Sequence, residues 1–125
     1  MTQIALIVED DLSLAEAINK KLQLNGFRTV AARSVDDALQ LMAAKRPTVI
    51  WLDHYLLGDK DGIDFAHAVR SNDDWKTVPM YVVSNTASTD KVTTYNELGI
   101  RGYYVKADHR LDEIIADIKA GIRRE

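Results

Sequence analysis

Short apolar runs alternate with longer amphipathic segments along the whole chain. Runs of this length, bounded by segments with helical periodicity, are typical of buried parallel strands. We expect strands at Ile4–Val8, Arg28–Ala31, Val49–Leu52, Met80–Val83 and Gly102–Val105. The third run is the most hydrophobic, so its strand should be central, whereas the second run is a weak strand.

The segments between these runs repeat their apolar residues at intervals of three and four, as one face of an α-helix does. We expect helices at about 12–25, between the cap Ser34 and Pro47, after a polar loop at 58–62, at about 88–98 and at about 111–123. The fourth helix is the weakest prediction because its middle is rich in threonine, a poor helix former. The fifth is the clearest, because its apolar residues form one stripe, namely Leu111, Ile114, Ile115, Ile118 and Ile122.

The alternation of strands and helices fixes the fold class. Strands separated by helices of this length need right-handed crossovers and therefore form a parallel sheet. The 125 residues are enough to bury roughly two-thirds of the unfolded surface, which supports a core without disulfides. We therefore predict an α/β fold, with residues 1–125 forming one domain.

Charged and hydroxyl side chains follow four of the predicted strands directly. Glu9-Asp10-Asp11 follows the first strand, Asp53 the third, Ser84 the fourth and Lys106 the fifth. Ligands of open α/β sheets bind outside the carboxyl ends of the strands, so these side chains should converge at one edge. The set suits a divalent cation and a phosphoryl group. A nucleotide polyphosphate would need glycines where the acidic residues stand.

The carboxylates in this set should repel one another. Glu9, Asp10 and Asp53 crowded together would raise the pKa of at least one of the three. A hard cation with oxygen ligands relieves such crowding, and Mg²⁺ typically uses one or two carboxylates together with water and phosphate oxygens.

Composition excludes several other functions. The net charge of −3, with no run of basic residues, gives no electrostatic reason to expect nucleic acid. The sequence has no cysteine, which rules out disulfides and thiolate metal sites. The longest apolar stretch, Ile4–Val8, is too short to span a membrane, and no signal-peptide pattern is present. We therefore expect a cytoplasmic protein that is not embedded in a membrane.

The motifs together resemble the receiver domain of bacterial two-component response regulators, over essentially the whole chain. The resemblance is carried by Val8–Asp11, Leu52–Asp53, Val83–Ser84 and Gly102–Lys106. Each motif is weak alone, but all occur in order and at strand ends. The resemblance implies a doubly wound, flavodoxin-like sheet of strand order 2-1-3-4-5. It also implies a signalling module that catalyses only its own phosphorylation and dephosphorylation.

The resemblance assigns the metal ligands. Asp10 and Asp53 would bind Mg²⁺ directly, Glu9 would act through water, and the third protein ligand would be the backbone carbonyl of Tyr55. Asp53 would then be the nucleophile that attacks the phosphorus of a phosphohistidine and becomes an aspartyl phosphate.

The resemblance also assigns the residues that respond to the phosphoryl group. Lys106 and Mg²⁺ would offset its charge, and Ser84 would donate a hydroxyl to it. Tyr103 matches the family's switch aromatic through its distance from Lys106, with Tyr104 as the competing candidate. The expected partner is a sensor histidine kinase or histidine phosphotransfer protein. The output surface would be the fourth helix, fifth strand and fifth helix, through which the domain signals as a monomer or weak dimer.

Three positions depart from the family pattern. Ala107 stands where a proline usually follows the lysine, and Asn85 stands where a small residue usually follows Ser84. The loop after Asp53 has Leu57 in place of proline and is one residue longer. No reacting group is lost, but the kinetics of phosphorylation could differ.

Simpler interpretations of single residues remain. Asp10 and Asp11 could cap the first helix, Lys106 could be a solvated strand-end lysine, and Ser84 could be a helix-entry residue. We interpret His54 as a surface or loop histidine because successive strand residues face opposite sides. Trp51 and Trp75 are interpreted as packing residues.

Competing functions rank below the phosphoacceptor. A degenerate receiver would act only as a protein-interaction module, and the residues at 85 and 107 leave that possibility open. An aspartate-nucleophile phosphohydrolase would need a second acid where Tyr55 stands, and a cap domain. A flavodoxin-type flavin binder would need a glycine-rich phosphate loop in place of the acidic residues that follow the first strand.

Overall fold

A computed structural model describes residues 3–123 of the chain. It has five parallel strands, β1 (Ile4–Val8), β2 (Arg28–Ala32), β3 (Val49–Leu52), β4 (Met80–Ser84) and β5 (Gly102–Val105). The helices are α1 (Leu12–Leu24), α2 (Val35–Lys45), α3 (Gly62–Arg70), α4 (Thr89–Glu97) and α5 (Leu111–Arg123). The strand order is β2-β1-β3-β4-β5, so the predicted order and the central position of the third strand are confirmed.

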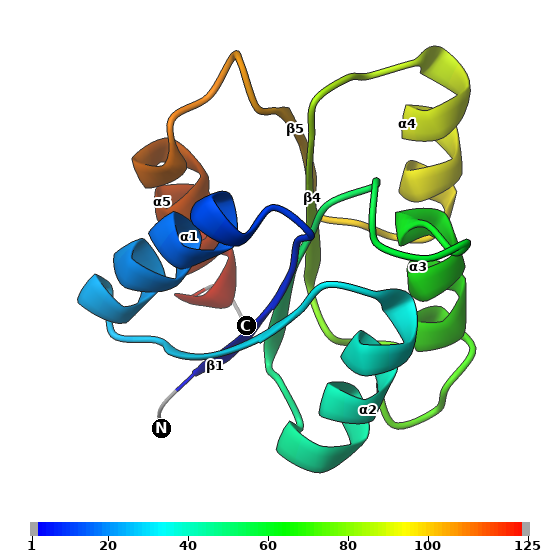
Figure 1. Ribbon diagram of the computed structural model, residues 1–125, viewed down its shortest axis with the longest axis horizontal. Helices are drawn as coiled ribbons and strands as arrows, with labels where there is room; N and C mark the ends of the chain where they lie inside the picture. The colour runs from blue at the N-terminus through cyan, green and yellow to red at the C-terminus, as the bar shows by residue number, and fades with distance from the viewer. Residues whose placement is uncertain (1–2, 124–125) are drawn as a thin grey trace.

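The helices cover both faces of the sheet. Figure 1 shows α1 and α5 on one side and α2, α3 and α4 on the other. Alternate strand residues point to the two layers, as the two-residue period of a strand requires. Leu6 and Ile50 pack toward α2, α3 and α4, whereas Ile7 and Trp51 pack toward α1 and α5. The buried strands therefore read as continuous apolar runs in the sequence.

Side-chain caps fix where the helices begin. Asp11 accepts a hydrogen bond from the Leu14 amide at 3.1 Å, so the capping interpretation is confirmed for Asp11. Ser34 caps α2 as predicted, and Ser88 caps α4. Each cap satisfies an amide at the helix start that has no partner within the helix.

The start of the third helix differs from the prediction, whereas the end of the second agrees with it. The third helix already begins at Gly62, which we expected in the loop, because Asp61 and Asp64 form a reciprocal capping box just before it. The second helix ends at Lys45, before Pro47 as predicted, and Arg46 forms its C-cap with a left-handed φ of 49°.

The carboxyl ends of the strands lie level with one another. Val8 is in register with Leu52, and Ser84 with Val105. The residues that follow β1, β3 and β5 therefore leave the sheet along one edge, together with Ser84 at the end of β4. None of the helices within residues 3–123 combines the length and the hydropathy needed to cross a lipid bilayer.

Candidate functional site

Backbone hydrogen bonds extend the parallel ladder beyond the strand ends and hold the site residues in place. The amide of Asp53 donates to the Val8 carbonyl at 2.9 Å, and that of Lys106 donates to the Ser84 carbonyl at 2.8 Å. The amide of Glu9 likewise donates to the Ala32 carbonyl at 3.0 Å. These hydrogen bonds hold the backbone of each residue in place independently of its side-chain contacts.

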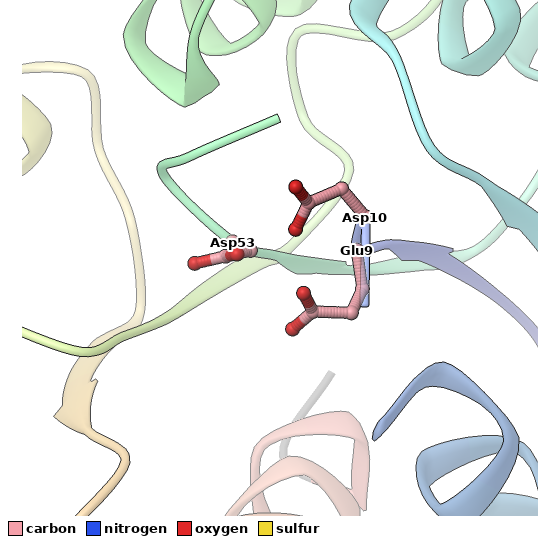
Figure 2. Close-up of side chains that lie close together, drawn as sticks. All are labelled: Glu9, Asp10 and Asp53. Atoms are coloured by element: carbon pink, nitrogen blue, oxygen red, sulfur yellow. The ribbon is translucent and has the colours of Figure 1, made fainter. Parts of the chain in front are cut away.

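Three carboxylates gather at this edge of the sheet. Glu9, Asp10 and Asp53 each offer one oxygen, and these oxygens lie within 4.8 Å of one another. Figure 2 shows Glu9 and Asp10 extending from the end of β1 toward Asp53. Glu9 and Asp53 are buried, with exposed fractions of 1% and 2%, whereas Asp10 is half-buried. An all-oxygen donor set of this kind fits a hard divalent cation such as Mg²⁺.

Lys106 faces the carboxylates. Its Nζ lies 2.9 Å from Oε1 of Glu9 and 3.5 Å from Oδ2 of Asp53. Burial lowers the pKa of Lys106, but the hydrogen bond to Glu9 and the charge of Asp53 outweigh burial, so the pKa is raised overall. The ammonium group therefore stays charged, and Lys106 is not merely a solvated strand-end lysine.

Glu9 carries the cost of the crowded carboxylates. The pKa of Glu9 is raised to about 7, mainly by burial; the hydrogen bond from Lys106 opposes this rise, and the nearby charge of Asp53 adds to it. The amide of Asp11 also donates to Glu9 Oε2 at 3.2 Å. The raised pKa of Glu9 agrees with the prediction that at least one of the three carboxylates has a raised pKa.

Two buried polar atoms at the site lack partners. Within residues 3–123, Oδ1 of Asp53 and Oγ of Ser84 are buried and make no hydrogen bond. Buried polar atoms are nearly always paired in native proteins, so each unpaired atom needs an explanation. A bound cation or phosphoryl group would supply partners for both, which fits the ligands that the acidic cluster and Lys106 select.

The loops above the site bring in residues whose contacts the sequence did not predict. Lys91 of α4 donates to the Thr86 hydroxyl at 3.0 Å and to the Tyr55 hydroxyl at 3.3 Å. Tyr103 donates its hydroxyl to the Thr86 carbonyl at 2.6 Å. The side chain of Tyr55 is half exposed and accepts this hydrogen bond from Lys91. The role of its backbone carbonyl as a metal ligand stays a prediction.

The two candidate switch tyrosines face opposite layers. Tyr103 packs partly buried against the core beneath α3 and α4, whereas Tyr104 packs on the α1 and α5 side and donates to Asp117 at 2.8 Å. Tyr103 is therefore the tyrosine that lies next to α4.

His54 lies in the loop after β3, as predicted, but it is not a surface histidine. Its side chain is buried, with an exposed fraction of 8%, and its Nδ1 lies 2.7 Å from the hydroxyl of Tyr95. The alternation of strand residues gave no sign that Tyr95 of α4 covers this side chain. Trp51 and Trp75 do pack in the two layers, as predicted.

The departures from the family pattern have simple geometry. Residues 3–123 contain no cis peptide bond, so the bond between Lys106 and Ala107 is trans. Asn85 is exposed beside the site. Leu57 is also exposed, and its amide donates to the Arg33 carbonyl at 3.0 Å, which holds the longer loop against the chain after β2.

A family model described as the response regulator receiver domain matches residues 5–119. The chain belongs to the response regulator receiver domain family. The response regulator MprA of Mycolicibacterium vanbaalenii is 29% identical over 119 residues, which cover 95% of this chain and 50% of the relative. This receiver domain thus spans about half the length of the curated relatives that it matches.

Solved structures show the same fold. A two-component response regulator from Clostridium difficile is 20% identical with a TM-score of 0.89, and the alignment covers 98% of each chain. The BeF3-activated N-terminal receiver domain of RstA from Klebsiella pneumoniae is 23% identical with a TM-score of 0.84. That alignment covers 94% of this receiver domain and 97% of the RstA chain. Membership of the receiver domain family makes the chain a signalling module of a two-component system.

Proposed function

We propose that Asp53 accepts a phosphoryl group from a phosphohistidine in a Mg²⁺-dependent reaction. Two features of Asp53 carry this proposal. Its Oδ1 is buried and has no hydrogen-bond partner within the described residues, and its Oδ2 lies 3.5 Å from the ammonium group of Lys106. A nucleophilic carboxylate needs one oxygen free to attack, and it needs positive charge beside the group that arrives.

The transfer itself requires little covalent chemistry from the protein. A carboxylate oxygen of Asp53 forms the new bond to phosphorus as the phosphorus–nitrogen bond of the phosphohistidine breaks, and the electron pair returns to the imidazole. Lys106 offsets the charge on the equatorial oxygens, and the unpartnered Ser84 hydroxyl donates to one of them. Catalysis is then mainly positioning and electrostatics.

The metal site would be formed by the acidic cluster. Asp10 and Asp53 would bind Mg²⁺ directly, Glu9 would act through water, and the backbone carbonyl of Tyr55 would complete the protein ligands. Bound Mg²⁺ would supply positive charge to the phosphoryl oxygens and relieve repulsion among the carboxylates. The relative RstA is a BeF3-activated receiver domain, and we propose that beryllofluoride binds this domain in the same way.

The phosphodonor would be a sensor histidine kinase or a histidine phosphotransfer protein. We propose that this receiver domain, like such donors, acts in the cytoplasm.

Ser84 and Tyr103 would transmit the presence of the phosphoryl group to the surface formed by α4, β5 and α5. The domain would signal through this surface as a monomer or weak dimer. The contact of Tyr103 with Thr86, which follows Ser84 by two residues, supports this assignment. We propose that residues 1–125 form one receiver domain.

Intact mass after incubation with acetyl phosphate and Mg²⁺ tests the proposal. We expect one phosphoryl adduct on the wild-type chain, none on Asp53→Asn, and a reduced yield on Asp10→Ala. Asp73→Asn is a matched control, because Asp73 is exposed and its ion pair is with exposed Lys76 at 3.4 Å, away from the site. A full adduct on Asp53→Asn would contradict the proposal, and no adduct on wild type would favour a degenerate receiver.

A further inference from the structure

A buried hydrogen bond joins the residue directly after Asp53 to helix α4. Nδ1 of His54 lies 2.7 Å from the hydroxyl of Tyr95, which is fully buried in the C-terminal half of α4. These residues are 41 positions apart in the chain. The contact is buried and long-range, and one of its two residues is the neighbour of the proposed phosphoacceptor in the sequence.

The surrounding groups define which atom donates. Nε2 of His54 lies 3.6 Å from Oδ2 of Asp61, the residue that caps α3. The carboxylate favours a proton on Nε2, which leaves Nδ1 as the acceptor for the Tyr95 hydroxyl.

The packing around this bond leaves little space. A Cβ atom built on Gly62 would overlap the Tyr95 hydroxyl and would lie 2.8 Å from the Asp53 carbonyl oxygen and 3.0 Å from Cα of His54. The amide of Gly62 also donates to the His54 carbonyl at 2.8 Å. The backbone after Asp53, the start of α3 and Tyr95 of α4 are therefore in close contact at one point.

Tyr95 makes a second contact on its other side. Its ring lies 5.9 Å from the ring of Tyr103, centroid to centroid, and Tyr103 in turn donates to the Thr86 carbonyl. Tyr95 thus stands between the turn after Asp53 and the tyrosine of β5. If either the turn after Asp53 or Tyr103 moves, it displaces or is blocked by the buried side chain of Tyr95.

Separating the pair without replacement would be costly. Tyr95 has an exposed fraction of 0% and His54 of 8%, so water cannot replace the lost hydrogen bond while α4 stays in place. A buried polar group without a partner carries its full desolvation penalty. The turn and the helix are accordingly expected to move together.

We propose that Tyr95, acting through His54, is a positioning residue that couples helix α4 to the turn after Asp53. This inference rests on the proposed phosphoacceptor function, because it assigns a route by which a ligand at Asp53 alters α4. By linkage, the same bond makes the position of α4 affect how the site binds a phosphoryl group.

The variant Tyr95→Phe tests the inference, because it removes only the hydroxyl and keeps the ring between His54 and Tyr103. Tyr104→Phe is the matched control, since it removes a tyrosine hydroxyl that donates to Asp117 on the opposite face of the sheet. His54→Leu breaks the same bond from the other end. The measurement is the change in amide chemical shifts on adding beryllofluoride and Mg²⁺ to the 125-residue chain.

We expect Tyr104→Phe to match wild type. In Tyr95→Phe, the shift changes at Asp10, Asp53 and Lys106 should persist, while those across α4 should fall to less than about half. The double variant His54→Leu with Tyr95→Phe should lose no more of the α4 response than either single variant, because both remove one bond. An α4 response of wild-type size in Tyr95→Phe would overturn the inference, as would additive losses in the double variant. Absence of any response at the site in wild type would instead contradict the proposed function, and the inference would fall with it.

Discussion

At the scale of single residues, the site consists of carboxylates whose charges are costly because the side chains are buried. Glu9 is almost fully buried and is held by Lys106 at 2.9 Å and by the amide of Asp11. The single ammonium group of Lys106 serves both Glu9 and Asp53, which leaves the carboxylates under-neutralised in the absence of a cation. Stability without metal should therefore depend on pH and on each acidic residue.

Glu9→Gln should remove a pH dependence of stability from the metal-free protein. Burial raises the pKa of Glu9 from the ordinary 4.5 to about 7, so the folded protein binds this proton more tightly than the unfolded chain does. The associated stabilisation is full below pH 4.5 and is lost as the pH rises through about 7. Urea unfolding in EDTA should show wild type losing on the order of 3 kcal/mol relative to Glu9→Gln between pH 5 and 8. Parallel pH profiles for the two proteins would contradict the raised pKa.

Asp10→Asn should stabilise the metal-free protein and weaken its response to Mg²⁺. Asp10 is half-buried, with one oxygen within 4.8 Å of those of Glu9 and Asp53, so removing its charge relieves repulsion. The free energy of unfolding should rise by on the order of 1 kcal/mol in EDTA. The Mg²⁺-dependent increase in melting temperature should shrink. Asp11→Asn is the control, because Asp11 caps α1 and an asparagine retains that hydrogen bond.

At the scale of elements, α4 combines weak helix propensity with a strong anchor. Its mean hydropathy is low and its middle is rich in threonine, yet Ser88 caps its start and Tyr95 is fully buried on its inner face. Tertiary contacts at Tyr95 therefore hold a helix that its local sequence favours only weakly. Away from Tyr95, such a helix opens locally at low cost, and a ligand at the site can shift it readily.

Thr93→Ala tests whether low propensity matters for the response of α4. Thr93 is exposed in the middle of the helix, so alanine should stabilise α4 by a few tenths of a kcal/mol without touching the site. Amide hydrogen exchange across residues 89–97 should slow by about two-fold. The same substitution outside this helix, at exposed Thr77, should leave those rates unchanged. Unchanged exchange in Thr93→Ala would show that packing alone sets the opening of α4.

At the scale of the whole molecule, the sequence predicted what depends on local pattern. Each strand end was recognisable because an apolar run stopped at a polar residue, and parallel pairing then brought Glu9, Asp53, Ser84 and Lys106 to one edge. The link between His54 and Tyr95 was missed because it depends on how α4 packs beside α3 and the loop after β3. No spacing between positions 54 and 95 encodes that packing, although a large aromatic in a polar helix was a signal that it is anchored there.

The central claim is that this edge of the sheet makes Asp53 a phosphoacceptor. The most direct measurement is reductive trapping, in which borohydride converts an aspartyl phosphate to homoserine, followed by peptide mass mapping. After incubation with acetyl phosphate and Mg²⁺, homoserine should appear at position 53 alone, and it should be absent when EDTA replaces Mg²⁺. Homoserine at another acidic position, or none under any condition, would contradict the account.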